Sequence, residues 1–444
     1  MLFDYVGSGM SFTRIIDVDV AKTDTFIERM NIVLDAFNEK HKYIKHSLLY
    51  NAFAEPKFPD FFKNYHNELY ADSGGLQVVT RGAEITDEIR QKIYETQSKA
   101  DYAFCFDKIP VISEGSVGRV IINQKRYVLE DEFFSSGQQT GAYIKEQIEK
   151  MKELNAKTKI FMIIQGQNAD DYVDFANGVL NALPKEYIDS LEGIALAGAS
   201  AGEGIKFDIS RNLAVAKLEI DERLKKRIHL LGAGVIRKVV LSHYILNKFI
   251  DNPYISFDSS THTRLSTNGV FYDRGDIFKK TSKKLSLPKL SKGSVDNHSH
   301  KHYELAKNLE NMFNELDIDM VSLGYKDFND LYKWVKINEA YTKTSFIEEN
   351  DNLDDLIKYI FIDFLRYIGS VFNFGNDLGN IITNHREIEF LSTIKKTKHL
   401  SLLKELKTIE DFEYFLKEFG SELVDNEFQR IKSPDDIKPR VSLF

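Results

Sequence analysis

Lys159-Ile-Phe-Met-Ile-Ile164 is a largely apolar run that stops at the polar segment Gln165-Gly-Gln167. An amphipathic stretch at 169–183 follows, and a second apolar run, Gly193-Ile-Ala-Leu196, comes next. Strands that are continuously apolar, without alternating polar residues, belong to parallel sheets that are covered on both faces. The segment therefore predicts a strand-helix-strand unit of a parallel α/β fold.

The same unit recurs between about residues 68 and 262, with amphipathic stretches such as 142–154 between the runs. The other apolar runs are Glu68-Leu-Tyr-Ala71, Tyr102-Ala-Phe-Cys-Phe106, Ile228-His-Leu-Leu231 and Tyr254-Ile-Ser-Phe257. Six such strands, with room for two more in residues 10–55, predict a (β/α)8 barrel of the TIM type. An open doubly wound sheet is the weaker alternative, because no Gly-x-Gly-x-x-Gly follows the first strand.

Two segments of different character follow the barrel. Residues 276–302 include six lysines between Asp276 and Asp296, among Ser, Gly and Pro residues and with no acid between these two aspartates. The stretches 303–316 and 353–371 are amphipathic and indicate helices. The sequence therefore predicts a barrel over 1–275, a basic loop over 276–302 and a helical C-terminal region over 303–444.

The composition excludes several classes of protein. Of the 444 residues, 43% are hydrophobic and 28% are charged, as in folded globular proteins. A net charge of −8 argues against a chain that is coated with positive charge for nucleic acid. Without a long apolar stretch or a signal-peptide pattern at its start, the sequence predicts a cytoplasmic protein with no membrane span. The single cysteine, Cys105, excludes an internal disulfide and any zinc site that needs two thiolates.

Polar and small residues follow each predicted strand. They are Asp72-Ser-Gly-Gly-Leu-Gln77, Asp107, Gln165-Gly-Gln167, Ala197-Gly-Ala199, Gly232-Ala-Gly234 and Asp258-Ser-Ser-Thr-His-Thr-Arg264. In a TIM-type barrel the C-terminal ends of the strands meet at one mouth, where the active site lies. We therefore expect three aspartates, a glutamine and several glycines to face one cavity.

Five strings of the sequence, in this order, resemble the tRNA-guanine transglycosylase family. They are Ala71-Asp-Ser-Gly-Gly-Leu-Gln77, Ile164-Gln-Gly166, Gly193-Ile-Ala-Leu-Ala-Gly-Ala-Ser-Ala-Gly-Glu203, Leu231-Gly-Ala-Gly234 and Phe257-Asp258 with Thr263-Arg264 and Asn268-Gly269. The resemblance covers about residues 68–270 and implies a (β/α) barrel, in agreement with the pattern of apolar runs.

The resemblance implies a base-exchange reaction, in which guanine leaves a nucleoside and a 7-deazaguanine base takes its place. Asp258 matches the family's nucleophile, which forms a covalent bond to the sugar C1′ as in retaining glycosidases. Asp72 matches the aspartate that acts as acid and base on the departing and entering ring nitrogens. In isolation, an Asp before Ser-Gly-Gly also suits a turn or a helix N-cap.

The resemblance also implies a pocket for the base. Asp107 would accept hydrogen bonds from the guanine N1–H and exocyclic amine, and Gln165 would donate one to O6. The alternatives are a surface pair of Asp107 with Lys108 and a bond from Gln165 to backbone. The other substrate-binding candidates are Ser73, Phe106, Gly198, Ala199 and Leu231. Gly198, which has no side chain, would let the backbone approach the edge of the base. Phe106 and Leu231 would supply apolar surfaces against the faces of the base.

Family members that act on tRNA usually hold a zinc ion with three cysteines and a histidine, and this chain has no cysteine after Cys105. His298, His300 and His302 lie in the expected vicinity, and His385 weakly resembles the final zinc ligand. Alternate residues of one segment seldom complete a tetrahedral site without further ligands. We therefore expect neither a metal nor another cofactor.

The segment Ser260-Thr-His-Thr-Arg264 also departs from the tRNA enzymes, where this loop approaches the anticodon stem. Together with the missing zinc site, it favours the family branch that inserts 7-deazaguanine bases into DNA. The expected partners are DNA and a free base such as 7-cyano-7-deazaguanine, with Arg264, Lys279, Lys280, Lys283 and Lys284 as candidates for contacts to nucleic acid. A tRNA substrate, a non-catalytic subunit and an unrelated barrel hydrolase are the alternatives, and the sequence leaves open a homodimer or helper proteins.

Overall fold

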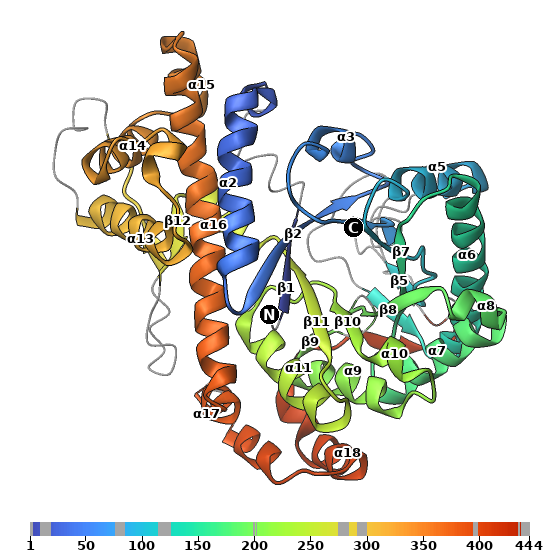
Figure 1. The fold of residues 1–444 in the computed structure, drawn as a ribbon. Helices are drawn as coiled ribbons and strands as arrows, with labels where there is room; N and C mark the ends of the chain where they lie inside the picture. Colours follow the sequence, from blue (N-terminus) through green and yellow to red (C-terminus); the bar gives the residue numbers. More distant parts are fainter. Residues whose placement is uncertain are drawn as a thin grey trace, which may run out of the picture.

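The computed structural model describes residues 3–8, 19–75, 85–113, 126–198, 200, 202–273, 284–290, 300–393, 398–433 and 436. Eight parallel strands form a closed barrel in the order β1-β11-β10-β8-β7-β4-β3-β2 (Figure 1). They are β1 Phe3–Ser8, β2 Ile44–Asn51, β3 Leu69–Asp72, β4 Tyr102–Phe104, β7 Lys159–Ile164, β8 Leu191–Leu196, β10 Arg227–Leu230 and β11 Tyr254–Ser259. The predicted (β/α)8 barrel is confirmed, and each of the six apolar runs forms one of its strands.

The first barrel strand lies outside the region in which the sequence predicts it. β2 falls within residues 10–55, but β1 precedes residue 10. Asp4 interrupts its apolar character, yet this carboxylate is buried and accepts hydrogen bonds from Ser47 Oγ at 2.8 Å and Tyr70 Oη at 2.7 Å. Partners from two neighbouring strands make this polar residue compatible with the barrel interior, which a search for apolar runs misses.

Helices cover the outside of the barrel between its strands. They are α2 Asp24–Lys40, α3 Phe58–Phe62, α5 Asp87–Gln97, α6 Phe133–Glu153, α7 Ala169–Ala182, α8 Lys185–Ile188, α9 Ile205–Lys217, α10 Glu222–Lys225, α11 Ile236–Phe249 and α12 Thr261–Thr267, with a 3₁₀ turn, η1, at Val20–Lys22. The stretches 142–154 and 169–183 are confirmed as parts of α6 and α7. These two helices pack closely, because a Cβ at Gly137 or Gly178 would overlap a backbone carbonyl of the facing helix.

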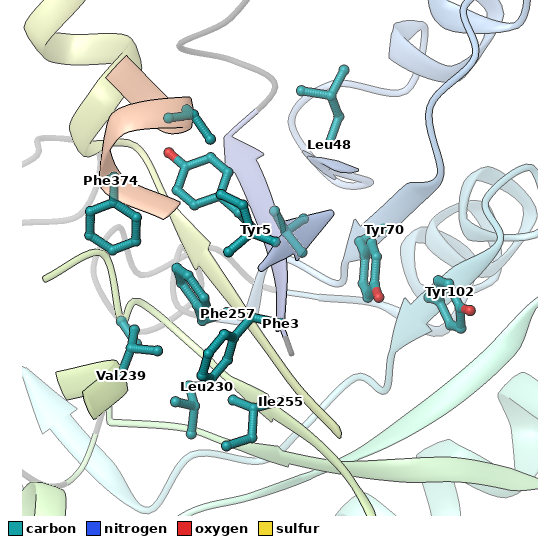
Figure 2. Close-up of a cluster of buried hydrophobic side chains, with 14 of the residues drawn as sticks. Phe3, Tyr5, Leu48, Tyr70, Tyr102, Leu230, Val239, Ile255, Phe257 and Phe374 are labelled. Carbon is teal, nitrogen blue, oxygen red and sulfur yellow. The ribbon is translucent and has the colours of Figure 1, made fainter. Parts of the chain in front are cut away.

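Aromatic side chains fill much of the barrel core (Figure 2). The ring of Phe257 lies 6.3 Å from that of Phe3 and 5.7 Å from that of Tyr5, and both contacts are edge-on. Phe374, from the C-terminal region, joins the same cluster, with its ring 6.0 Å from that of Phe257. Aromatic pairs of this geometry contribute about 0.5–1.5 kcal/mol each beyond the area that they bury.

The long helix α16, Leu353–Thr383, runs past the barrel (Figure 1) and packs against β1, β2 and β11 beside α12. Besides Phe374, it places the Tyr367 hydroxyl 2.8 Å from Nε2 of His46 on β2. The predicted helix at 353–371 is therefore confirmed but is twelve residues longer. α16 acts as the eighth helix of the barrel, since its apolar face packs on the strands.

The other helical elements of the C-terminal region are α13 His300–Leu316, η4 Met320–Leu323, α14 Phe328–Ala340, α15 Lys343–Glu349, α17 Glu387–Ser392, η5 Lys398–Lys404, α18 Ile409–Phe419 and η6 Gly420–Leu423. The predicted helix at 303–316 is confirmed as α13. In the described part of the chain, no helix combines the length and the apolar character that a membrane span requires.

Two parts of the predicted domain organisation need correction. The region 303–444 is not only helical, because β14 Val424–Asn426 pairs with β9 Glu203–Gly204 and β15 Gln429–Ile431 pairs with β6 Arg126–Leu129, beside β5 Val111–Ser113. The segment 276–302 is not all loop, because β13 Lys284–Ser286 pairs with β12 Val270–Tyr272 and α13 begins at His300. Strands of two to four residues are set by their distant partners and have no reliable local pattern.

Candidate active site

A cavity of about 370 Å3 lies at the C-terminal ends of the barrel strands. Its volume is typical of a site for a small molecule. Its lining comprises Leu49, Asp72, Gly75, Asp107, Ile109, Ile163, Gln165, Ala197, Gly198, Gly202, Glu203, Gly204, Phe207, Asp208, Arg211, Leu231, Gly232, Lys238 and Asp258. Six of the predicted site residues thus come together here: Asp72, Asp107, Gln165, Gly198, Leu231 and Asp258.

The other predicted site residues that the structure describes do not line this cavity. Phe106 is not among the described residues that line the cavity; it is buried, and its ring lies 5.3 Å from that of Tyr143, so its predicted contact with a base needs correction. Ser73 is also buried away from the lining, and its hydroxyl has no hydrogen-bond partner among the described residues. Arg264 and Lys284 are exposed outside the cavity. Ala199, Lys279, Lys280 and Lys283 fall outside the described residues.

Asp72 is the last residue of β3, and its carboxylate accepts a hydrogen bond from Asn51 Nδ2 at 3.1 Å. Gly74 has a φ of +86°, a left-handed conformation that brings the backbone against Asn51 and Phe53, where a Cβ would collide. Burial, and then the charges of Asp107 and Asp258, raise the pKa of Asp72 to about 7. A carboxyl group with this pKa can both donate and accept a proton near neutral pH.

Asp107 and Gln165 form a direct pair, with Gln165 Nε2 donating to Asp107 Oδ2 at 2.7 Å. Burial raises the pKa of Asp107 to about 6, although the bond from Gln165 opposes the shift. The alternative of a surface pair with Lys108 is wrong, since only 6% of Asp107 is exposed. A Cβ at Gly75 would lie 2.7 Å from Asp107 Oδ1, so a glycine there leaves the carboxylate open to the cavity.

Asp258 lies in β11 with 17% of its side chain exposed. Its Oδ1 accepts a hydrogen bond from the backbone N–H of Gly232 at 2.6 Å. Gly232 adopts a φ of +67°, and this left-handed turn after β10 directs its N–H at the carboxylate. The arrangement fixes one carboxylate oxygen and leaves the group at the cavity wall.

His229 is a site residue that the sequence interpretation misses. It is fully buried in β10, and its Nε2 lies 3.4 Å from Asp258 Oδ1, while its Nδ1 lies 2.9 Å from Ser256 Oγ. A carboxylate can only accept, so Nε2 is the nitrogen that carries the hydrogen in this contact. The only local signal was a histidine within the apolar run Ile228-His-Leu-Leu231.

The described histidines that were considered as metal ligands, His300, His302 and His385, do not form a cluster. Among the described residues, no group of three or more His, Cys, Asp or Glu side chains is arranged to hold a metal ion. His302 is buried in α13, and burial lowers its pKa. His300 lies at the surface 3.4 Å from Glu304, and His385 is exposed just after α16. His298 falls outside the described residues.

Comparison with known proteins adds no identification to this geometry. No protein-family model matches the chain, and no curated protein matches it.

Proposed function

We propose that the protein is a transglycosylase that exchanges guanine in a polynucleotide, most favourably DNA, for a 7-deazaguanine base through a covalent aspartyl-sugar intermediate. The observation that carries this proposal is the single cavity at the barrel mouth where Asp72, Asp107 and Asp258 meet in three different environments. The ordered resemblance to guanine transglycosylases gives each carboxyl group a role that its environment suits.

In the first half-reaction, Asp258 attacks C1′ of the target guanosine on the face opposite the base. The bond from C1′ to N9 breaks, its electron pair stays with guanine, and the proton of Asp72 neutralises the departing base. In the second half-reaction, the entering base gives its ring N–H proton to the Asp72 carboxylate and bonds to C1′, which releases Asp258. Two displacements retain the configuration at C1′.

The pair of Asp107 and Gln165 suits the recognition of guanine. Asp107 can accept from the N1–H and the exocyclic amine of the base. The Gln165 amide nitrogen carries two hydrogens, of which one binds Asp107 and the second is available for the neighbouring carbonyl O6. The hydrogen bond between the two side chains therefore fixes their positions, and each side chain can still bind the base.

Labelled guanine, offered with separate pools of duplex DNA, single-stranded DNA and tRNA, tests this function. A stacked and paired guanosine hides C1′ and must be flipped out, so we expect most label in single-stranded DNA. Preferential labelling of tRNA would favour the alternative substrate. Release of free guanine without any incorporation would indicate a hydrolase, and no reaction at all would indicate a non-catalytic subunit.

The polynucleotide is expected to contact the exposed cations that follow β11, Arg264 on α12 and Lys284 on β13. Removing one cation that binds a phosphate lowers the salt slope of binding to single-stranded DNA by about 0.7. We expect the double variant Arg264→Ala/Lys284→Ala to bind DNA more weakly with a slope lower by about 1.4, while the affinity for free guanine is unchanged. Fluorescence anisotropy over a range of salt concentrations measures both quantities, and the exposed Lys92→Ala on α5 is the control. An unchanged slope would remove these two residues from the DNA interface.

His229 is expected to position Asp258 through its Nε2 contact. Replacing it by Leu should lower the exchange kcat roughly tenfold with little change in KM for the base, because a misplaced reactive group slows the reaction itself. His229→Gln should recover part of the rate, since its amide can donate to the same carboxylate. Steady-state kinetics of both variants measure this, and equal losses in the two would instead indicate a packing role.

A further inference from the structure

The cavity contains a second set of charged groups that base exchange does not use. Arg211 on α9 and Lys238 on α11 line it together with Asp208 and Glu203, and Arg237 forms an ion pair with Asp208 at 3.6 Å. α9 and α11 pack against each other and follow β8 and β10, so this set occupies the side of the mouth between Gly198 and Gly232. We call Arg211 and Lys238 the cationic subsite.

Arg211 is held in place but keeps unused donors. Its side chain is 4% exposed, and Nη2 lies 2.9 Å from Asp208 Oδ1. Nevertheless, neither Nε nor Nη2 has a partner with hydrogen-bond geometry among the described residues. These two nitrogens are buried, and Nη2 is paired with Asp208, so the nitrogen that Arg211 presents toward Gly198 and the cavity is Nη1. A guanidinium N–H at this position can donate to a ligand that accepts hydrogen bonds.

Lys238 adds a cation that has no direct ion pair among the described residues, although Asp208 and Glu203 lie near it. Arg211 and Arg237 already share Asp208, and in the described part of the chain no carboxylate lies within ion-pair distance of the Lys238 ammonium. Burial is the main cause that lowers the pKa of Lys238; Asp208 and Glu203 oppose this shift, and the two arginines add to it. A bound anion would relieve the repulsion among these three cations.

Gly198 leaves the cationic subsite open to the base pocket. A Cβ at Gly198 would lie 3.9 Å from Arg211 Nη1, and no other heavy atom of the described residues, apart from its chain neighbours, would lie within 4 Å. In a 7-deazaguanine, the substituent at C7 lies on the same side of the ring as O6. A base whose O6 is held by Gln165 therefore directs this substituent past Gly198 toward the guanidinium.

We infer that Arg211 and Lys238 select an entering base whose C7 substituent is negatively charged and accepts hydrogen bonds, with a carboxylate as the best fit. This inference rests on the proposed function and specifies which base enters. A carboxylate can take two parallel hydrogen bonds from a guanidinium, and a neutral nitrile accepts only one. The ammonium of an aminomethyl substituent would lie against two cations and is disfavoured.

Calorimetric binding of free bases to the full chain tests the inference without catalysis. The probes are guanine and the 7-carboxy, 7-cyano and 7-aminomethyl forms of 7-deazaguanine. We expect the carboxy form to bind at least about tenfold more tightly than the aminomethyl form, with the cyano form between them. Equal affinities for the carboxy and aminomethyl forms, or the reverse order, would overturn the inference.

Lys238→Met keeps the length of the side chain and removes its charge. It should weaken binding of the carboxy form about tenfold and leave guanine within twofold, since guanine has no C7 substituent. Lys248→Met, a half-buried lysine on the same helix, is the matched control and should change neither affinity. A loss of affinity for guanosine 5′-phosphate, but not for the carboxy base, would assign the subsite to a phosphate and overturn the inference. Incorporation of labelled guanine tests the proposed function separately.

Discussion

Asp258→Asn reduces guanine exchange by at least roughly a thousandfold, because it removes the atom that forms the covalent bond to C1′. The asparagine carbonyl oxygen can still accept the hydrogen bond from the Gly232 N–H, which the wild-type carboxylate accepts at 2.6 Å. The variant should therefore fold and bind free guanine normally. Incorporation of labelled guanine into DNA measures the loss, and calorimetry with guanine measures the retained binding.

Asp251→Asn is the matched control for this variant. It makes the same chemical change in a side chain that is 81% exposed just before β11, and it should exchange guanine at the wild-type rate. A second test is trapping of the covalent adduct between protein and oligonucleotide after rapid denaturation. Wild-type rates for Asp258→Asn, or an adduct on another residue, would contradict the nucleophile assignment.

Asp72→Asn is expected to slow exchange by about a hundredfold to ten-thousandfold, the usual contribution of a general acid or base. The wild-type release of guanine should fall about tenfold per pH unit as the pH rises above about 7, because the acidic form of Asp72 is then lost. The three carboxyl groups interact, so this apparent pKa belongs to the set. The variant should lack the fall near pH 7, which single-turnover release of labelled guanine measures at each pH.

The same residue should limit the stability of the protein. The folded state raises the pKa of Asp72 from 3.8 to about 7, so the folded state binds more protons than the unfolded state between these values. Its contribution to stability is therefore lost as the pH rises through this window. Asp72→Asn removes the penalty and should melt at a higher temperature than the wild type at pH 8, with a smaller difference at pH 5. A lower melting temperature at pH 8 would show that the carboxylate is stabilised by its surroundings.

The sequence alone was sufficient to predict the barrel and many of the residues that line the cavity. Continuously apolar runs have few alternatives to buried parallel strands, and all six runs form barrel strands. A closed barrel then carries every strand end to one mouth, which is why Asp72, Asp107, Gln165 and Asp258 could be grouped without coordinates.

Several features instead depend on contacts between residues far apart in the chain. Asp4 fits within β1 because Ser47 and Tyr70 satisfy its carboxylate, and His229 faces Asp258 only after β10 and β11 pair. β14 and β15 form because the chain returns to β9 and β6, more than 200 residues earlier. The sequence around a short strand or a buried polar side chain does not indicate which distant residues it will pair with.

The cationic subsite is another feature that the local sequence does not predict, and it lies in the cavity itself. In the sequence, Arg211 and Lys238 are ordinary charged residues of two amphipathic helices, and such residues usually face solvent. The packing of α9 against α11 directs both into the cavity, and Gly198 leaves the space in front of Arg211 free. Periodicity along a chain thus indicates which residues form strands and where the strands end. The side of a helix that faces a ligand is set by the angle and distance at which helices pack, and these follow from the whole tertiary structure.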